Sequence, residues 1–284
     1  MLKPMEPEYR QHIDESGNFF FQIKWDGIRL IADMEGGRLQ LYTRKARLRT
    51  LHYPELVEEL NAISCSDFII DGELIAVGPD GLPDFQQILK RDLAKKVRSD
   101  IPLAYMAFDC LRLEGQPLEQ MEIEERQSVL HHLLETIGSR QLISECRNFD
   151  NGIELFQQMQ QRGMEGVVSK RRHSPYLVGR KTPLWQKTKC WRELDVRAQA
   201  VNYRDGRPVS VAVTRLDGNV PLGSVSSGLS SADWRLILKN QEQTNWDRNG
   251  LAPLAEPVSL RVRFLEWTHE GHLRAPVVLR IYSR

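Results

Sequence analysis

The sequence predicts an α+β fold in two parts, first hairpins with scattered helices and then a section built mainly of strands. In the N-terminal two thirds, short aromatic and branched runs are interspersed with segments of helical periodicity. After about Arg192 the pattern changes to five strand-like runs and one helix. The length of 284 residues also favours two domains, because single cores seldom grow beyond ~250–300 residues. Strands and helices do not alternate regularly, which argues against a doubly wound parallel sheet.

The first part begins with strands and continues with helices between them. Gly36–Gly37 is a favourable two-residue hairpin turn, and Pro54 stands near the start of a helical pattern. We expect strands at Phe19–Lys24, Leu30–Met34, Arg38–Thr43, Leu103–Leu111 and Gly166–Lys170, and a strand pair at Asp67–Val77. We expect helices at Pro54–Ile63, Pro83–Arg91, Leu118–Ile137 and Gly152–Arg162.

The second part reads as a small barrel of the OB type. The expected strands are Asp195–Tyr203, Val209–Leu216, Leu222–Ser227, Val258–Thr268 and Pro276–Tyr282. One amphipathic helix is expected to start at Ser231 and run to Asn240, with Asp233 as an acid in its first turn. Five strands and one helix in about ninety residues suit an OB barrel. The junction is expected at Trp191–Asp195.

The near-neutral total charge hides a strongly basic segment. The chain has 39 Lys and Arg against 38 Asp and Glu, a formal net charge of +1. Between Arg162 and Arg192, however, nine basic residues face one acid, Glu165, so the segment carries +8 (nine minus one). Tyr176, Trp185 and Trp191 lie among these bases. Such interleaving favours nucleic-acid binding over a merely solvated surface.

Cysteine usage and hydropathy narrow the class of protein. The four cysteines form no CxxC pair, which favours reduced thiols and argues against a zinc site built on them. The N-terminus lacks the apolar run of a secretory signal, and no stretch approaches ~18 consecutive apolar residues. We therefore expect a cytoplasmic protein without a membrane span.

Several short segments carry residue types suited to phosphate chemistry, although each alone has an ordinary explanation. The segment KWDGIR, which starts at Lys24, could be a surface hairpin, and Phe108 alone would more often be a core residue. The carboxylates of Asp71-Gly72-Glu73 are expected at a turn. Lys187 and Lys189 are expected on one face of a strand, because side chains alternate with a period of two.

Taken together and in order, KWDGIR, LYTRKAR, DGE, YMAFDCL, EGVVSKR and WQKTK resemble the nucleotidyltransferase motifs of ATP-dependent DNA ligases. They are most similar to the ligase module of bacterial end-joining DNA ligases, over about Phe19 to Lys189. The resemblance implies an adenylation (nucleotidyltransferase) domain at residues 1–191 and an OB-fold domain at 192–284. It also implies that the protein seals 5′-phosphate/3′-hydroxyl breaks in duplex DNA through a lysyl-AMP intermediate and a DNA-adenylate, in DNA repair.

The resemblance assigns a role to each matching residue. Lys24 is the implied nucleophile, and nearby cations or a metal ion are expected to lower its pKa. The implied catalytic residues are Lys24, Arg29, Lys187 and Lys189. The residues implied to bind ATP are Gln22, Ile23, Lys24, Arg29, Arg44, Glu73, Phe108, Glu165, Lys187 and Lys189. Within this set Phe108 stacks on adenine, and Gln22 and Ile23 read its edge.

The resemblance also implies a metal ion and a DNA surface. Glu73 and Glu165 offer hard oxygen ligands, which imply Mg²⁺ or Mn²⁺. Contacts with the DNA backbone are expected from Arg171, Arg172, Arg180 and Lys181. The chain departs from the family near its C-terminus, where a basic–acidic signature lacks its acid. The bases there are Arg274, Arg280 and Arg284, and self-adenylation is expected to be slower or differently oriented.

Two other functions compete with this interpretation. An RNA ligase or a GTP-dependent capping-type nucleotidyltransferase would share the chemistry, and the labelling nucleotide and the sealed nick would discriminate. A non-catalytic single-strand-binding protein would need no nucleophile and no pair of carboxylates at a phosphate site. The expected partners are nicked or broken duplex DNA and, as a candidate, an end-binding repair protein. We expect a monomer in the bacterial cytosol, nucleoid-associated when acting, with a hinge near Trp191–Leu194.

Overall fold

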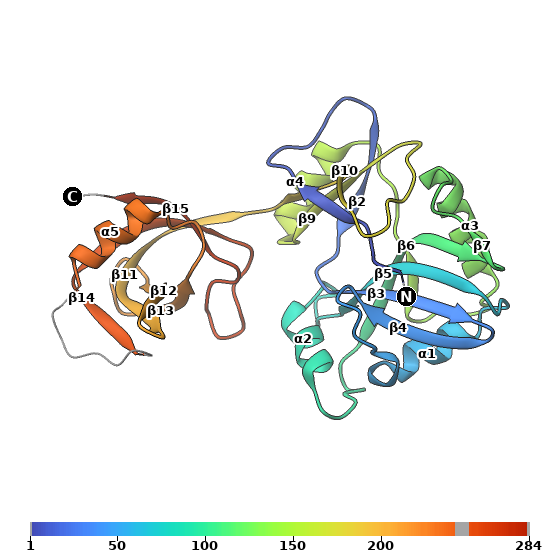
Figure 1. Ribbon diagram of the computed structural model, residues 1–284, viewed down its shortest axis with the longest axis horizontal. Helices are drawn as coiled ribbons and strands as arrows, with labels where there is room; N and C mark the ends of the chain where they lie inside the picture. Colours follow the sequence, from blue (N-terminus) through green and yellow to red (C-terminus); the bar gives the residue numbers. More distant parts are fainter. Residues whose placement is uncertain (1, 242–249, 283–284) are drawn as a thin grey trace. The chain divides into compact units, whose positions relative to one another are not determined.

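The computed structural model describes residues 2–241 and 250–282, and the chain divides into two compact units, Met1–Cys190 and Trp191–Arg284. Both units are dominated by antiparallel strands and carry few helices, so the predicted α+β class is confirmed (Figure 1). Within the described ranges, no helix reaches the length and apolar character that a membrane span requires.

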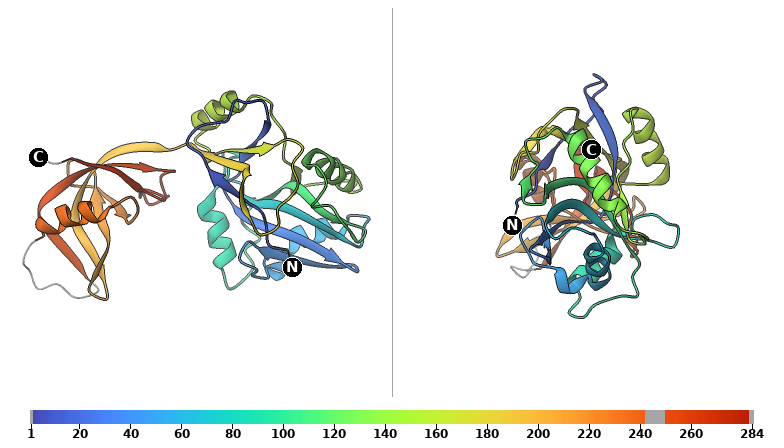
Figure 2. Two further views of the ribbon diagram at one scale, coloured as in Figure 1. Left: turned by 45° about the horizontal axis from the view of Figure 1, so that its top comes forward. Right: turned by 90° about the vertical axis from the view of Figure 1, so that its right-hand side faces the viewer.

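Two sheets form separate layers in the first unit (Figures 1 and 2). The first sheet has the order β1-β10-β9-β2 and contains β1 (Glu6–Tyr9), β2 (Phe19–Lys24), β9 (Gly166–Arg171) and β10 (Lys181–Lys189). The second has the order β4-β3-β5-β6-β7 and contains β3 (Ile28–Glu35), β4 (Arg38–Thr43), β5 (Phe68–Ala76), β6 (Leu103–Leu113) and β7 (Gln116–Pro117), with β8 (Ile143–Glu145) beside β6. All these pairings are antiparallel except β1–β10 and β6–β8.

The helices of this unit begin at residues that suit a helix N-terminus, either a proline or a capping side chain. They are α1 (Pro54–Asn61), α2 (Phe85–Leu93), α3 (Ile123–Glu135) and α4 (Gly152–Arg162), with a short 3₁₀ turn at Thr50–His52. Pro54 supplies the first residue of α1. The carboxylate of Asp84 accepts the Gln87 N–H at 3.0 Å, and the Asn151 side chain does the same for α4.

Apolar side chains fill the layers on either side of the sheets. The largest core, with Leu30, Leu56 and Leu130 at its centre, packs α1–α3 against the second sheet. A second cluster contains Phe20, Ile31 and Trp185, which come from both sheets. Burial of this cluster holds the two sheets against each other, and their strand ends define the site described below.

Three details of the first unit differ from the prediction. Asp67–Val77 forms one strand, β5, rather than a strand pair, and Gly72 lies in its middle. A side chain is excluded at this position, because a Cβ there would stand 2.5 Å from the buried Tyr105 ring. The glycine therefore serves a close approach rather than a turn. α2 begins at Phe85, two residues later than expected, and α3 begins at Ile123, five residues later than expected.

The second unit is an antiparallel sheet with one helix. Its order is β13-β12-β11-β14-β15, with β11 (Arg192–Arg204), β12 (Arg207–Thr214), β13 (Pro221–Val225), β14 (Leu251–Phe264), β15 (Val277–Tyr282) and α5 (Ser231–Lys239). Ser230 and Asp233 cap α5 reciprocally. Because Arg192 already pairs with Phe264, residues 192–194 are part of a sheet, and a hinge would have to lie before them. Trp246, expected in the barrel core or a packed loop, and Arg284 lie outside the described residues.

Candidate active site

A cavity of about 680 Å³ in the first unit is lined by residues of both sheets. Its size suits a nucleotide-sized ligand. The predicted residues that line it are Gln22, Ile23, Lys24, Arg29, Arg44, Glu73, Phe108, Glu165 and Lys187. Lys189 does not line the cavity, but its ammonium lies 3.0 Å from a carboxylate oxygen of Glu165. The structure therefore brings together side chains that are up to 167 positions apart in sequence (189 minus 22).

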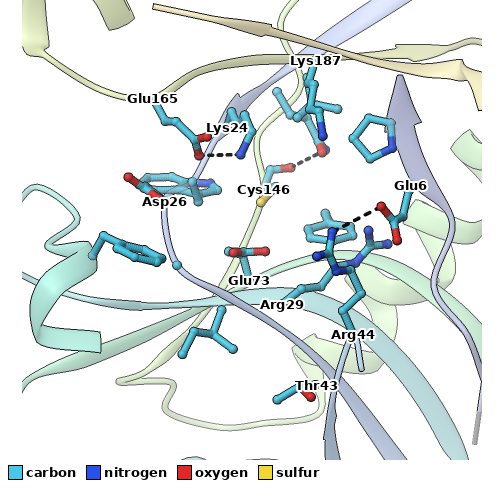
Figure 3. A pocket seen from close by; sticks show the side chains of 18 of the residues that line it. Glu6, Lys24, Asp26, Arg29, Thr43, Arg44, Glu73, Cys146, Glu165 and Lys187 are labelled. Atoms are coloured by element: carbon cyan, nitrogen blue, oxygen red, sulfur yellow. Dashed lines mark hydrogen bonds and ion pairs between the residues drawn. The ribbon is translucent and has the colours of Figure 1, made fainter. Parts of the chain in front are cut away.

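Lys24 lies at the end of β2 and forms an ion pair with Glu165 (Figure 3). Backbone pairing explains this placement, because Lys24 is opposite Gly166, the residue that follows Glu165. Gly166 has a φ of +149°, and a Cβ at this position would lie 2.1 Å from the carbonyl oxygen of Thr188. Only glycine lets the chain pass β10 this closely and deliver the carboxylate to the lysine.

The ion pair sets the protonation of the site. Burial disfavours the charged forms, but the Glu165 carboxylate outweighs it and raises the pKa of Lys24. The two ammonium groups beside Glu165 likewise outweigh burial and lower the pKa of that carboxyl group. The structure thus keeps Lys24 protonated, contrary to the expected depression of its pKa by neighbouring cations. Lys187 does show a lowered pKa, through burial and then the charge of Lys24.

Glu73 is a carboxylate that no described cation pairs with. It projects into the cavity from β5, and it makes no hydrogen bond or ion pair to any described residue. Burial raises its pKa to about 8. A half-buried carboxylate without a cationic partner fits a divalent cation, and Glu165 is the second hard oxygen donor on the cavity wall. The residues present therefore suit the implied Mg²⁺ or Mn²⁺.

Arg29 is held by protein groups on several sides. Its Nε and Nη2 donate to the two oxygens of Asp71 at 2.8 and 2.5 Å, and its Nη1 donates to the Met5 carbonyl at 2.6 Å. Nη2 also lies 3.2 Å from the Tyr176 hydroxyl. Four of the five N–H donors of a guanidinium are then engaged. One N–H donor of Arg29 therefore remains for a phosphate.

The residues that hold Arg29 were not predicted. Met5 comes from the segment before β1, which pairs in parallel with β10 and lays Glu6 and Pro7 along the cavity. A four-residue strand with two glutamates and a proline has no recognisable strand pattern. Asp71 could have been found, because it stands two positions from Glu73 in the quoted DGE segment.

Glu6 forms an ion pair with Arg44 across one wall of the cavity, at 3.2 Å (Figure 3). Both side chains are at least one third exposed, so the contact contributes little to stability. Arg44 starts a basic turn whose Lys45, Arg47 and Arg49 also line the cavity. This wall therefore presents positive charge to any phosphate that enters.

Phe108 lies on the cavity wall among cations. The Lys170 ammonium stands 4.4 Å from the centre of its ring, and the Arg29 guanidinium 5.3 Å. The Trp185 and Phe108 rings meet edge to face, and their centres are 5.9 Å apart. Lys170 is only 2% exposed, and burial lowers its pKa to about 8. The alternation of side chains along β9 could have identified Lys170 as a cavity residue, because Lys170 shares a face with Val168, which also lines the cavity.

The predicted DNA-contacting residues lie away from the cavity lining. Arg171, Arg180 and Lys181 are exposed, and Arg172 pairs with Asp150 at 2.6 Å. In the second unit, Arg274 pairs with Glu266 at 2.8 Å.

The described residues form a site suited to nucleotidyl transfer. Around a nucleotide-sized cavity it contains a lysine paired with a carboxylate, a second, unpaired carboxylate and further cations. A sequence model of the ATP dependent DNA ligase domain matches residues 1–189. The chain belongs to this family, as the order of its motifs predicted.

Individual relatives agree with this assignment. The chain is 30% identical to the SPbeta prophage-derived DNA ligase-like protein LigB of Bacillus subtilis, over 91% of each protein. It is 27% identical to the multifunctional non-homologous end joining DNA repair protein LigD of Mycobacterium tuberculosis, over 92% of this chain and 35% of LigD. The chain thus spans about a third of the length of these LigD relatives. These comparisons favour the DNA ligase family over the RNA-ligase and capping alternatives.

Solved structures support the fold of both units. A structure described as mycobacterial DNA ligase D complexed with ATP and MES superimposes with a TM-score of 0.61 at 25% identity, over 99% of this chain and 95% of that one. A Lig E DNA ligase structure reaches a TM-score of 0.71 at 18% identity, over 99% and 100%. The predicted succession of a nucleotidyltransferase fold and an OB fold is confirmed.

Proposed function

We propose that this protein is an ATP-dependent DNA ligase that seals 5′-phosphate/3′-hydroxyl breaks in duplex DNA. One observation carries the proposal: Lys24 is paired with Glu165 on the wall of a cavity that also holds Glu73, Arg44 and Lys187. A protein that only binds nucleic acid has no use for a nucleophile beside two carboxylates.

In the first step, Lys24 Nζ attacks the α-phosphorus of ATP. The new N–P bond replaces the P–O bond to pyrophosphate, which leaves, and the lysine nitrogen releases two protons to water as it changes from ammonium to phosphoramide. Since Glu165 raises the pKa of Lys24, this step requires that the hold of Glu165 be relaxed. The positive wall with Arg44 and Lys187 balances the charge of the departing phosphates.

Glu73 and Glu165 are the residues that would hold a divalent cation. A bound Mg²⁺ or Mn²⁺ supplies positive charge at the phosphate oxygens. A Glu165 carboxylate shared with such a cation would stabilise the ammonium form of Lys24 less strongly than the present ion pair does. Lys189, the second partner of Glu165, then positions that carboxylate.

In the later steps, AMP passes to the 5′-phosphate of DNA, and the 3′-hydroxyl then displaces it. Phe108 offers an aromatic face to the adenine, while Arg29 is the positioned cation behind it. The DNA backbone is expected on Arg171, Arg172, Arg180 and Lys181. Such contacts are salt-dependent and read no sequence.

The biological setting follows from the relatives. LigD is named as a non-homologous end joining repair protein, so we propose a role in repair at broken or nicked DNA in the bacterial cytosol. The adenylation domain (1–191) and the OB domain (192–284) would act as a monomer, with an end-binding protein as candidate partner and a hinge at residues 190–191.

Labelling with α-³²P-ATP and Mg²⁺ tests the proposal. The parent should acquire AMP through a bond that survives denaturation, and Lys24→Ala should not. Lys90→Ala, an exposed lysine on α2, is the matched control and should label normally. Sealing of nicked DNA but not of nicked RNA, and labelling by ATP rather than GTP, would separate the proposal from its alternatives. A Lys24→Ala protein that still labels would refute it.

A further inference from the structure

A chain of three side-chain amides leads from the cavity to α3. Gln22 lies two residues before Lys24 in β2, lines the cavity and is only 2% exposed. Its Nε2 donates to Asn148 Oδ1 at 2.8 Å, and Asn148 Nδ2 donates to Gln127 Oε1 at 2.8 Å. Gln127 belongs to α3 and is 8% exposed. Asn148 bridges the two buried glutamines.

Asn148 and a main-chain carbonyl together set the orientation of the Gln22 amide. Gln22 Nε2 also donates to the carbonyl oxygen of Cys146 at 3.3 Å (the dashed line at Cys146 in Figure 3). A carbonyl can only accept, so the nitrogen of the Gln22 amide, not its oxygen, must face it. The Cys146 carbonyl is itself fixed, because the Cys146 N–H donates to Ala107 of β6 at 2.8 Å.

Backbone pairing also holds Asn148 in place. Phe149 and Phe21, the neighbours of Asn148 and Gln22, exchange two N–H···O=C bonds of 2.9 Å. If the Gln22 amide turned over, its oxygen would face two acceptors, Cys146 O and Asn148 Oδ1. With the nitrogen engaged, the Gln22 oxygen is the group left for the cavity, since no described residue donates to it.

We propose that Asn148 is a positioning residue that orients the Gln22 amide, so that the site selects a nucleobase with an exocyclic amino group. An oxygen acceptor can receive a hydrogen bond from the 6-amino group of adenine. It repels the 6-oxo group of hypoxanthine or guanine. This inference rests on the proposed function and deepens it, because it names the device by which the cavity prefers ATP.

The test is the ratio of AMP to IMP transfer onto Lys24. ATP and ITP differ only at position 6 of the base and the proton on N1, so their relative KM values report this contact. The parent should prefer ATP, and Asn148→Leu should reduce the preference by about 3–10-fold, the value of one net hydrogen bond. Asn148→Asp keeps an acceptor toward Gln22 and should restore the parent ratio. Asn61→Leu, an exposed asparagine at the end of α1, is the matched control.

The outcomes separate the two proposals. Asn148 is exposed, so its replacement should leave the melting temperature close to that of the parent. A folded Asn148→Leu protein with the parent ratio, or a parent without preference, would overturn the role of Asn148. If the parent does not label at all, the proposed function fails instead. Equilibrium binding of ATP and ITP to Lys24→Ala, with and without Asn148→Leu, then still measures the base preference.

Discussion

Replacement of Glu73 by glutamine should stabilise the protein in alkaline solution while weakening its response to metal ions. Burial raises the pKa of this carboxyl group from 4.5 to about 8. The folded state therefore binds a proton that the unfolded state has released between these pH values, and ionisation opposes folding increasingly as the pH rises through this window. A neutral glutamine amide carries no such penalty.

The size of the effect follows from the same interval. A difference between 4.5 and about 8, at ~1.4 kcal/mol per pH unit, sets a ceiling of about 5 kcal/mol. Because the side chain is partly exposed to the cavity, water reduces this penalty, and we expect a gain of about 1–3 kcal/mol at pH 9. Near pH 5 the folded carboxyl group is neutral, so Glu73→Gln should gain little there.

Denaturant unfolding at about pH 5 and about pH 9 measures the difference. Glu58→Gln, an exposed glutamate on α1, is the matched control and should show no pH-dependent gain. Binding of Mn²⁺ should strengthen in the parent as the pH rises toward 8, and Glu73→Gln should lose this trend. The reasoning is refuted if the variant is less stable than the parent at pH 9, or if its gain does not depend on pH.

Three other changes probe different parts of the molecule. Arg126→Met should cost ~3–5 kcal/mol of unfolding free energy, because it leaves Asp109, which is completely buried and bonded at 2.7 and 2.9 Å, without its cation; a melting temperature equal to the parent's would contradict this. Phe108→Ala should raise the KM for ATP roughly tenfold by removing ~1–3 kcal/mol of stacking, and an unchanged KM would place the adenine elsewhere. Replacing Arg180 and Lys181 by alanine should weaken DNA binding in low salt and reduce its salt dependence by ~0.9 per lost phosphate contact, whereas an unaltered slope would remove them from the interface.

Local patterns predicted the strands that carry the site. The aromatic run before Lys24 and the apolar run around Phe108 each have the composition of a buried strand, and both are strands in the structure. Alternation along β10 also predicted one face for Lys187 and Lys189, and Lys189 lies beside Glu165. These features depend on neighbours in sequence, which is why composition and spacing sufficed.

The contacts of Arg29 and Lys24 depend on neighbours in space. The partners of Arg29 stand 24, 42 and 147 positions away, and no local pattern specifies which donor each receives. The expected lowering of the Lys24 pKa assumed that cations would be nearest, whereas the nearest charge is the Glu165 carboxylate. Gly72 was misread because a glycine can serve either a turn or a close approach, and only the position of Tyr105 distinguishes the two.

The pairing of the N-terminal segment with β10 determines when the site can form during synthesis. Met5 donates its N–H to Tyr176 across 171 positions, and its carbonyl holds Arg29. A nascent chain that ends at residue 170 contains the nucleophile, but it lacks Tyr176 and β10, the partners of Met5 and β1. Closing such a long loop is slow, and domains generally fold as units. β1 can therefore pair only after β10, the last strand of its domain, has been synthesised. A ribosome-bound fragment that ends before β10 should contain Lys24 without a complete cavity around it.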